Sequence, residues 1–182
     1  MVALGRLSLL FLVFALSFSP ANAETVRYVD RTDTTCGGKA PCYRTIQAAI
    51  NAAQPRDTIL IRAGVYPEQL TIEKNDFASA VENDRIVIQS DPVLTQEQVV
   101  LQGAGGSACT NNYAIRIRKS KFITIRGLTI TGAGAQAIFM QGGSNGNQGI
   151  HIELNRIFAN GLGNNCSGAI EINDGNPGTV CQ

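Results

Sequence analysis

The fold is decided by five short runs of sequence: AIRI (Ala114–Ile117), FITIRGLTITG (Phe122–Gly132), AIFM (Ala137–Met140), IHIELNRIFANG (Ile150–Gly161) and AIEI (Ala169–Ile172). In each run an aliphatic residue alternates with another residue type. This period of two is typical of a half-buried β-strand, and no window keeps the 3.6-residue period of a helix. The region is therefore predicted to consist of short strands.

The runs also repeat along the chain. A shift of 27 residues takes Ile123 to Ile150 and Ile130 to Ile157, and the pattern A-I-x-[IM] starts at positions 114, 137 and 169. Repeats of this length with three strands each indicate a solenoid wound as a triangular prism. Each strand then pairs in parallel with the strand one turn away, at about 4.8 Å. The Gly-, Asn- and Ser-rich loops 142–149 and 161–168 are predicted corners that absorb differences in turn length.

Two stretches resemble a known family. They are TIQAAINAAQPRDTILIRAGVYPEQLTI (Thr45–Ile72) and the ITIRGLTI/IHIELNRI repeat. From about Tyr28 onward the chain is similar to the pectin-lyase-like family of right-handed parallel β-helix proteins. The resemblance implies an all-β, right-handed, single-stranded parallel β-helix. It also implies a substrate groove on the outside of the sheet that contains the A-I-x-[IM] strands. This fold hosts many chemistries, so function has to be argued from individual residues.

Residues 1–23 are predicted to be a Sec signal peptide. Arg6 precedes an apolar core at Leu7–Phe18, and Ala21–Ala23 form an A-x-A cleavage site. The core is too short for a membrane span, which needs roughly 20 residues. Without Arg6 the formal charge falls from +1 to about 0, which gives no general attraction to nucleic acid or to a membrane. We therefore expect a secreted, periplasmic or extracellular protein.

Residues 24–57 are predicted to form a first strand and a capping α-helix, and residues 58–182 the turns of the β-helix. In Thr45–Ala53, the apolar residues Ile46, Ala49, Ile50 and Ala53 form one stripe that begins after a capping threonine. This helix is predicted to cover the open end of the solenoid, the alternative being a helix packed on its side. Gly64–Pro67 (GVYP) is predicted to be a tight corner.

No second covering element follows Ala169–Ile172. A β-helix that stopped there would expose its last apolar layer. We therefore expect either C-terminal turns missing from this sequence or a partner that covers this end.

The five cysteines all follow the predicted signal peptide, where disulfides are permitted. Cys36 and Cys42 enclose a short loop and are predicted to pair. The pairing of Cys109, Cys166 and Cys181 stays open, and an odd count leaves one thiol over.

Strand alternation predicts which side chains point outward. One column contains Arg116, Phe139 and Glu171, and the next contains Arg118, Gln141 and Asn173, with Asp174 just beyond. β-Elimination of a uronic-acid polymer needs a cation against the sugar carboxylate and a base near the proton that is removed. The predicted roles are catalytic for Arg116 and Arg118, and substrate-binding for Phe139, Gln141, Lys119 and Arg126. Glu171, Asn173 and Asp174 are a predicted Ca²⁺ site, since calcium prefers oxygen ligands.

Structural interpretations compete with these roles. The RIRKSK segment (116–121) is also typical of a solvated corner, and the acidic residues near Glu171 of a solvated last layer. The single histidine, His151, is interpreted as a surface residue, and Asn155 as a structural residue that bonds the backbone along the stack. Two functions follow. The first is a secreted protein that binds, and in its enzymatic form cleaves, an acidic polysaccharide. The second is a non-catalytic glycan-binding or cell-surface structural module.

Overall fold

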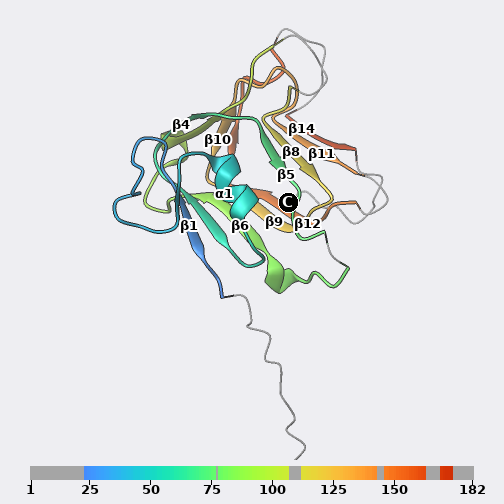
Figure 1. Ribbon diagram of the computed structural model, residues 1–182. Helices are drawn as coiled ribbons and strands as arrows, with labels where there is room; N and C mark the ends of the chain where they lie inside the picture. The colour runs from blue at the N-terminus through green and yellow to red at the C-terminus, as the bar shows by residue number, and fades with distance from the viewer. Residues whose placement is uncertain (1–22, 77, 107–111, 143–145, 163–168, 174–182) are drawn as a thin grey trace, which may run out of the picture.

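The computed structural model describes residues 23–76, 78–106, 112–142, 146–162 and 169–173. Within them the strands form three parallel sheets around one apolar core (Figure 1). Sheet A contains β2 (Cys42–Tyr43), β1 (Val26–Val29), β3 (Thr58–Ile61), β6 (Ile86–Ser90), β9 (Lys121–Arg126) and β12 (Gln148–Glu153). Sheet B contains β4 (Gly64–Pro67), β7 (Val99–Gln102), β10 (Thr129–Thr131) and β13 (Arg156–Ile157). Sheet C contains β5 (Leu70–Ile72), β8 (Ile115–Arg118), β11 (Ile138–Gln141) and β14 (Ile170–Asn173).

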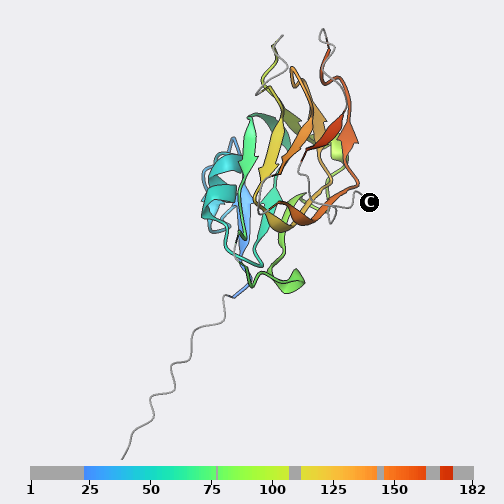
Figure 2. The ribbon, with the colours of Figure 1, turned by 90° about the vertical axis from the view of Figure 1, so that its right-hand side faces the viewer.

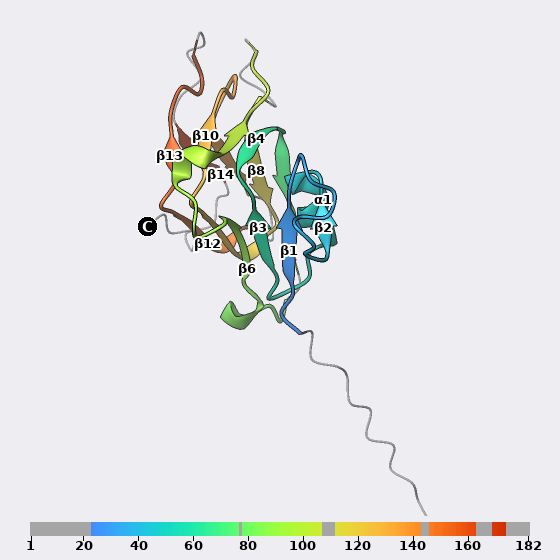
Figure 3. The same cartoon turned by 90° about the vertical axis from the view of Figure 1, so that its left-hand side faces the viewer.

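From β3 onward the chain visits sheets A, B and C in turn. β3, β4 and β5 make one turn, and β6, β7 and β8 stack on them in the same order. Figure 3 shows β1, β3, β6 and β12 of sheet A following one another across the molecule. The described residues thus have the predicted all-β, parallel β-helix-like arrangement.

The sequence repeat is confirmed by the strand register. Ile123 lies opposite Ile150, Ile125 opposite Ile152, and Ile130 opposite Ile157. Inward-facing residues of successive turns stack on one another, and Ile117 and Met140 are fully buried. Ile172, in the same column, is 43 % exposed.

Gly64–Pro67 forms a strand, β4, so the predicted tight corner is wrong. Tyr66 is fully buried, and its hydroxyl donates to the Arg62 carbonyl (2.9 Å), whereas Val65 points outward. Gly64 and Pro67 lie at the two ends of the strand, where they do not interrupt its pairing with β7. Burying the Tyr66 ring outweighs the turn preference of the residues beside it.

The helix α1 (Ile46–Ala52) lies at the end of the stack near β1 and β5, far from β14 (Figure 2). The Thr45 hydroxyl accepts from the Ala48 N–H (3.2 Å), as its predicted capping role requires. Glu68 adds two bonds, accepting from the N–H groups of Ile46 (2.9 Å) and Gln47 (3.0 Å). Ile46, Ala49 and Ile50 of the helix are buried in the same core as the strands.

Asparagine side chains hold the corners of the solenoid. The Asn155 side chain accepts from the Leu128 N–H (3.0 Å) and donates to the Ile125 carbonyl (2.8 Å), one turn away. Asn160 does the same with Ala133 (2.9 Å) and Ile130 (3.0 Å). The predicted structural role of Asn155 is confirmed.

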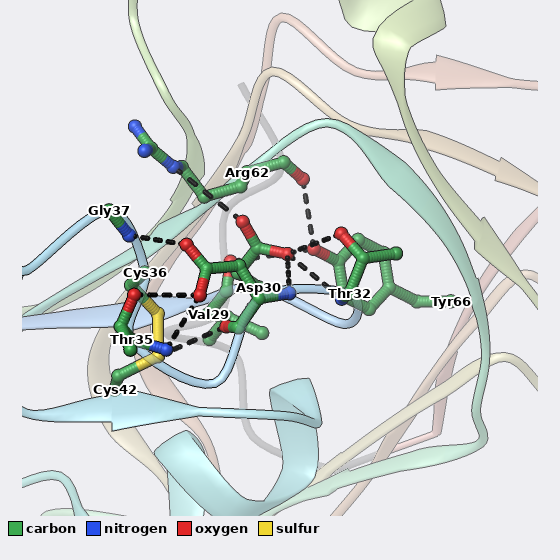
Figure 4. The surroundings of a disulfide bond; sticks show 10 residues. Val29, Asp30, Thr32, Thr35, Cys36, Gly37, Cys42, Arg62 and Tyr66 are labelled. Carbon is green, nitrogen blue, oxygen red and sulfur yellow. Dashed lines mark hydrogen bonds and ion pairs between the residues drawn. A yellow bond between two sulfur atoms is a disulfide. The ribbon is translucent and has the colours of Figure 1, made fainter.

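The predicted disulfide between Cys36 and Cys42 is present, with their Cα atoms 5.7 Å apart (Figure 4). Its loop is held by the Asp33 carboxylate, which accepts from the N–H groups of Thr35 (2.8 Å) and Gly37 (2.7 Å). Cys109, Cys166 and Cys181 lie outside the described residues, as do residues 1–22 of the predicted signal peptide. No helix in the described part of the chain is long and apolar enough to span a membrane.

Candidate functional site

The outer face of sheet C carries the predicted columns in register. Arg116 lies opposite Phe139, and Phe139 lies opposite Glu171 on the next strand. Beside them Gln141 lies between Arg118 and Asn173. Figure 2 shows the four strands of this sheet side by side, from β5 in green to β14 in red. The parallel register thus places residues 55 positions apart in sequence on one face.

An aromatic pair forms the centre of this face. The rings of Tyr113 and Phe139 stack with their centroids 5.9 Å apart and their planes 22° apart. The Arg116 guanidinium carbon lies 5.4 Å from the centroid of the Tyr113 ring, a cation–π distance. Tyr113 is 6 % exposed, whereas Phe139 is half-buried and presents part of its ring to the outside. Tyr113, Phe139 and Arg116 therefore form one platform, which we call the aromatic–arginine platform.

The Arg116 guanidinium has an unsatisfied donor. Its Nε is buried and has no hydrogen-bond partner, and no described residue forms an ion pair with this side chain. Arginine keeps its charge at all physiological pH values, and a buried donor without a partner costs about 1–3 kcal/mol. The other guanidinium nitrogens also bond no described residue, and they can bind an acceptor that a ligand supplies.

Glu171 is held by a second buried polar residue. Its carboxylate accepts from the side-chain amide of Gln136, which is 8 % exposed. Neither Gln136 nor Tyr113 was singled out in the sequence. Each lies just before an A-I-x-[IM] run, and this shared position is the sequence feature that could have pointed to both residues.

Most of the other predicted site residues lie on or beside the outer face of sheet C, whereas Arg126 lies on sheet A. Arg118 pairs with Glu73 (3.3 Å) at the edge of the sheet C surface, and Lys119 lies just after β8, exposed, with a φ of 45°. Gln141 and Asn173 are exposed on the second column. Arg126 lies on sheet A, where its Nε donates to Gln89 (2.6 Å), so the fold does not bring it to the platform.

The predicted calcium ligands are only partly described. Calcium takes six to eight oxygen ligands. The described residues supply Glu171 and Asn173, and Asp174 lies outside them. No three His, Cys, Asp or Glu side chains come together anywhere in the described chain. The described donors do not by themselves make up a calcium site, and no chemical step is assigned to the ion.

No family model matches the chain, and no curated protein matches it. Among solved structures, it is similar to the alginate lyase from Paenibacillus sp. str. FPU-7, with a TM-score of 0.47 and 18 % sequence identity. The match covers 76 % of this chain and 46 % of that one, so the chain spans less than half of the lyase. A likeness this weak supports no argument, and the fold assignment depends on the strand registers given above.

Proposed function

We propose that the outer face of sheet C binds an acidic polysaccharide, in a protein that is exported from the cytoplasm. The observation that carries the proposal is Arg116, whose buried Nε has no partner and whose guanidinium lies beside the stacked rings of Tyr113 and Phe139. A uronic acid offers a carboxylate for the arginine and a flat ring face for the aromatic side chain. The Cys36–Cys42 disulfide fits an oxidising location.

The spacing of the platform suits a chain of sugars. Arg116 and Glu171 are two strands apart, which is about 9.6 Å at the usual strand spacing. This is the span of two or three sugar units. Gln141 and Asn173 run parallel to this column and offer amide groups for hydroxyls. A polymer lying across the strands would contact the Arg116 cation and then the Phe139 ring, with these amides alongside it.

Cleavage by β-elimination is the enzymatic form of this proposal. It needs a cation at the sugar carboxylate, which Arg116 supplies, and a group that takes the proton from the neighbouring carbon. Tyr113 is the phenol in contact with Arg116. His151 lies on sheet A, and Glu171 is two strands away from Arg116. A module that binds glycans without cleaving them is the alternative, and it would use the same platform.

The test uses the full exported chain with polygalacturonate and with alginate, each with and without Ca²⁺. Binding is measured by affinity electrophoresis, and cleavage by the ultraviolet absorbance of unsaturated products. Arg116→Ala should weaken binding about tenfold or more, as the loss of one charge-assisted contact predicts. The matched control is Arg156→Ala, an exposed arginine on sheet B, with an expected change below about twofold.

Equal binding by wild type and Arg116→Ala would overturn the proposal. Binding without absorbance would leave the glycan-binding module and reject the lyase. An effect of Ca²⁺ on binding that Glu171→Gln abolishes would support the predicted ion site.

Two finer features of the fold belong to the same proposal. We propose that the solenoid winds right-handed, as parallel crossovers nearly always do. We also propose that α1 closes the N-terminal end. Its support is that Ile46, Ala49 and Ile50 are buried against the core and that the helix contacts β1, β2, β3 and β5.

A further inference from the structure

A second concave site lies at the corner between sheets A and B. It is a pocket of about 290 Å³. The residues that line it are Gln89, Ser90, Pro92, Leu94, Gln96, Arg126, Gly127 and Leu154. The chain passes this corner on its way from sheet A to sheet B, so the pocket is not part of the outer face of sheet C.

The pocket exists because one corner is longer than those that stack on it. Eight residues, 91–98, connect β6 to β7, whereas two residues connect β9 to β10 and two connect β12 to β13. The long corner contains the 3₁₀ turn η2 (Gln96–Gln98) and stands away from the stack. Since parallel strands must stay in register, the extra residues project outward and form an overhang.

Gln96 fastens the overhang to the turns that stack on it. The Gln96 side-chain amide donates to the Leu154 carbonyl, two turns of the corner away, and the Thr129 hydroxyl donates to the Gln96 carbonyl (3.0 Å). Within the loop, the Leu94 N–H donates to the Asp91 carbonyl (2.9 Å). The pocket is thus pre-formed, which reduces the entropic cost of binding a ligand.

Ser90 is a buried polar side chain that lines this pocket without a partner. It is 8 % exposed, and no hydrogen bond connects its hydroxyl to the described residues. Gly127, with a φ of +74°, lies against it, and a Cβ at that position would be 2.4 Å from the Ser90 Oγ. A glycine at position 127 therefore leaves room around a hydroxyl that no described residue bonds.

The charge in the pocket is already balanced. The Arg126 Nε donates to the side-chain amide oxygen of Gln89 (2.6 Å), and its Nη1 lies 3.6 Å from a Glu153 carboxylate oxygen. The Gln89 amide nitrogen has no described partner. Pro92, Leu94 and Leu154 supply an apolar wall opposite these polar groups.

We propose that this pocket binds one uncharged sugar ring. The apolar wall fits the C–H face of a pyranose, and the Ser90 hydroxyl and the Gln89 amide fit its hydroxyl groups. The volume lies just below the usual 300–1,000 Å³ of pockets for drug-sized ligands, as expected for a single ring. Because Glu153 compensates Arg126, an added carboxylate brings no advantage here. This site and the platform on sheet C depend on different residues, so either proposal can fail alone.

The test is a titration of the full exported chain, labelled with ¹⁵N, with D-glucose, D-galactose and D-mannose, and with D-galacturonate for comparison. At least one neutral sugar should shift the amide signals of Ser90, Gly127 and Leu154 in a saturable way, with a Kd on the order of millimolar. Galacturonate should bind no more tightly than galactose.

Variants separate the pocket from general surface effects. Leu154→Ser should weaken this binding about fivefold, since it removes part of the apolar wall. The matched control Val93→Ser changes a neighbouring exposed residue, 85 % exposed against 72 % for Leu154, that does not line the pocket. Ser90→Ala should weaken binding several-fold with an unchanged Tm.

Absence of shifts at these amides with all three neutral sugars would overturn the proposal. So would equal losses in Leu154→Ser and Val93→Ser. Tighter binding of galacturonate than of galactose would show an anion site in its place.

Discussion

Sheets A and C each carry an arginine and a glutamate in one outward column, but the two charged side chains form an ion pair on sheet A and not on sheet C. On sheet A the column contains Gln89, Arg126 and Glu153 on successive strands. Arg126 contacts both neighbours, at 2.6 Å and 3.6 Å. On sheet C, Phe139 lies between Arg116 and Glu171, and the two charged residues do not contact each other.

The residue in the middle of each column determines whether the arginine and the glutamate can pair. Side chains on neighbouring parallel strands are about 4.8 Å apart and pair readily, whereas two strands apart they are about 9.6 Å apart. Phe139 takes the place that a partner would need and stacks on Tyr113. Arg116 is left with a cation–π contact and an unsatisfied Nε. Arg126 on sheet A is therefore held by its neighbours within the fold, while Arg116 on sheet C remains available to a ligand.

The largest expected effect concerns Asp57, a buried charge that lies just before β3 of sheet A. Asp57 is 1 % exposed and accepts from Arg27 Nε (2.6 Å) and from the N–H groups of Thr25 (3.1 Å) and Gln54 (2.8 Å). Asp57→Ala leaves these donors without a partner, and we expect a loss of about 3 kcal/mol or more in the free energy of unfolding. Urea denaturation measures it.

Glu171→Ala is the comparison on sheet C, with an expected loss below about 1 kcal/mol because, among the described residues, its carboxylate is bonded to the Gln136 side chain alone. Equal losses in the two variants would remove the distinction between the sheets.

The second prediction concerns Phe139, whose ring separates Arg116 from Glu171. Phe139→Ala should lower the affinity for polygalacturonate or alginate about tenfold, because the platform loses a ring and Arg116 gains access to Glu171. Affinity electrophoresis at low salt measures it. Phe158→Ala is a matched control, since Arg156 lies 4.4 Å from the centroid of that ring beyond sheet B. If both variants lost affinity equally, the ring on sheet C would have no special role.

Strand periodicity predicted most of the fold because it is a local property of the sequence. The repeat at Ile123 and Ile150 implied the register of β9 with β12, and the register then implied the outward columns. Gly64–Pro67 was mispredicted because its glycine and proline indicate a turn locally, while burial of Tyr66 is a tertiary effect.

The site was less predictable than the fold. Arg116 and Arg126 look alike in sequence, and only their neighbours across strands distinguish them. Tyr113 and Gln136 lie in corners, where no periodicity gives a side-chain direction. Similarly, the pocket at the A–B corner depends on one loop being longer than those stacked on it.

The third prediction adds an available charge to sheet C. Glu73 pairs with Arg118 at 3.3 Å, and both side chains are more than one-third exposed. Glu73→Gln should raise the affinity for an acidic polysaccharide about two- to threefold, since exposed pairs are worth about 0.2–1 kcal/mol. Glu82→Gln frees the Arg85 guanidinium on the sheet A side in the same way, and we expect no gain there because that side lacks the aromatic–arginine platform. A gain in both variants would mean that net charge alone governs binding.

The smallest expected effect is a pH dependence on the sheet A side. The hydrogen bond from Arg85 holds the pKa of Glu82 below its ordinary value. A carboxyl group with a lowered pKa in the folded state contributes stability above its unfolded pKa of about 4.3, and this contribution is lost as the pH falls through the folded value. Wild type should therefore lose stability more steeply than Glu82→Gln between about pH 5 and pH 3. Since Glu82 is largely exposed, the difference should be a few tenths of a kcal/mol.

Thermal unfolding across this pH range measures the difference. A profile of Glu82→Gln that runs parallel to the wild-type profile would contradict the prediction. The pair of Arg85 and Glu82 would then add no pH-dependent stability, and the paired charges on the sheet A side would matter to the fold no more than the unpaired Arg116 does on sheet C.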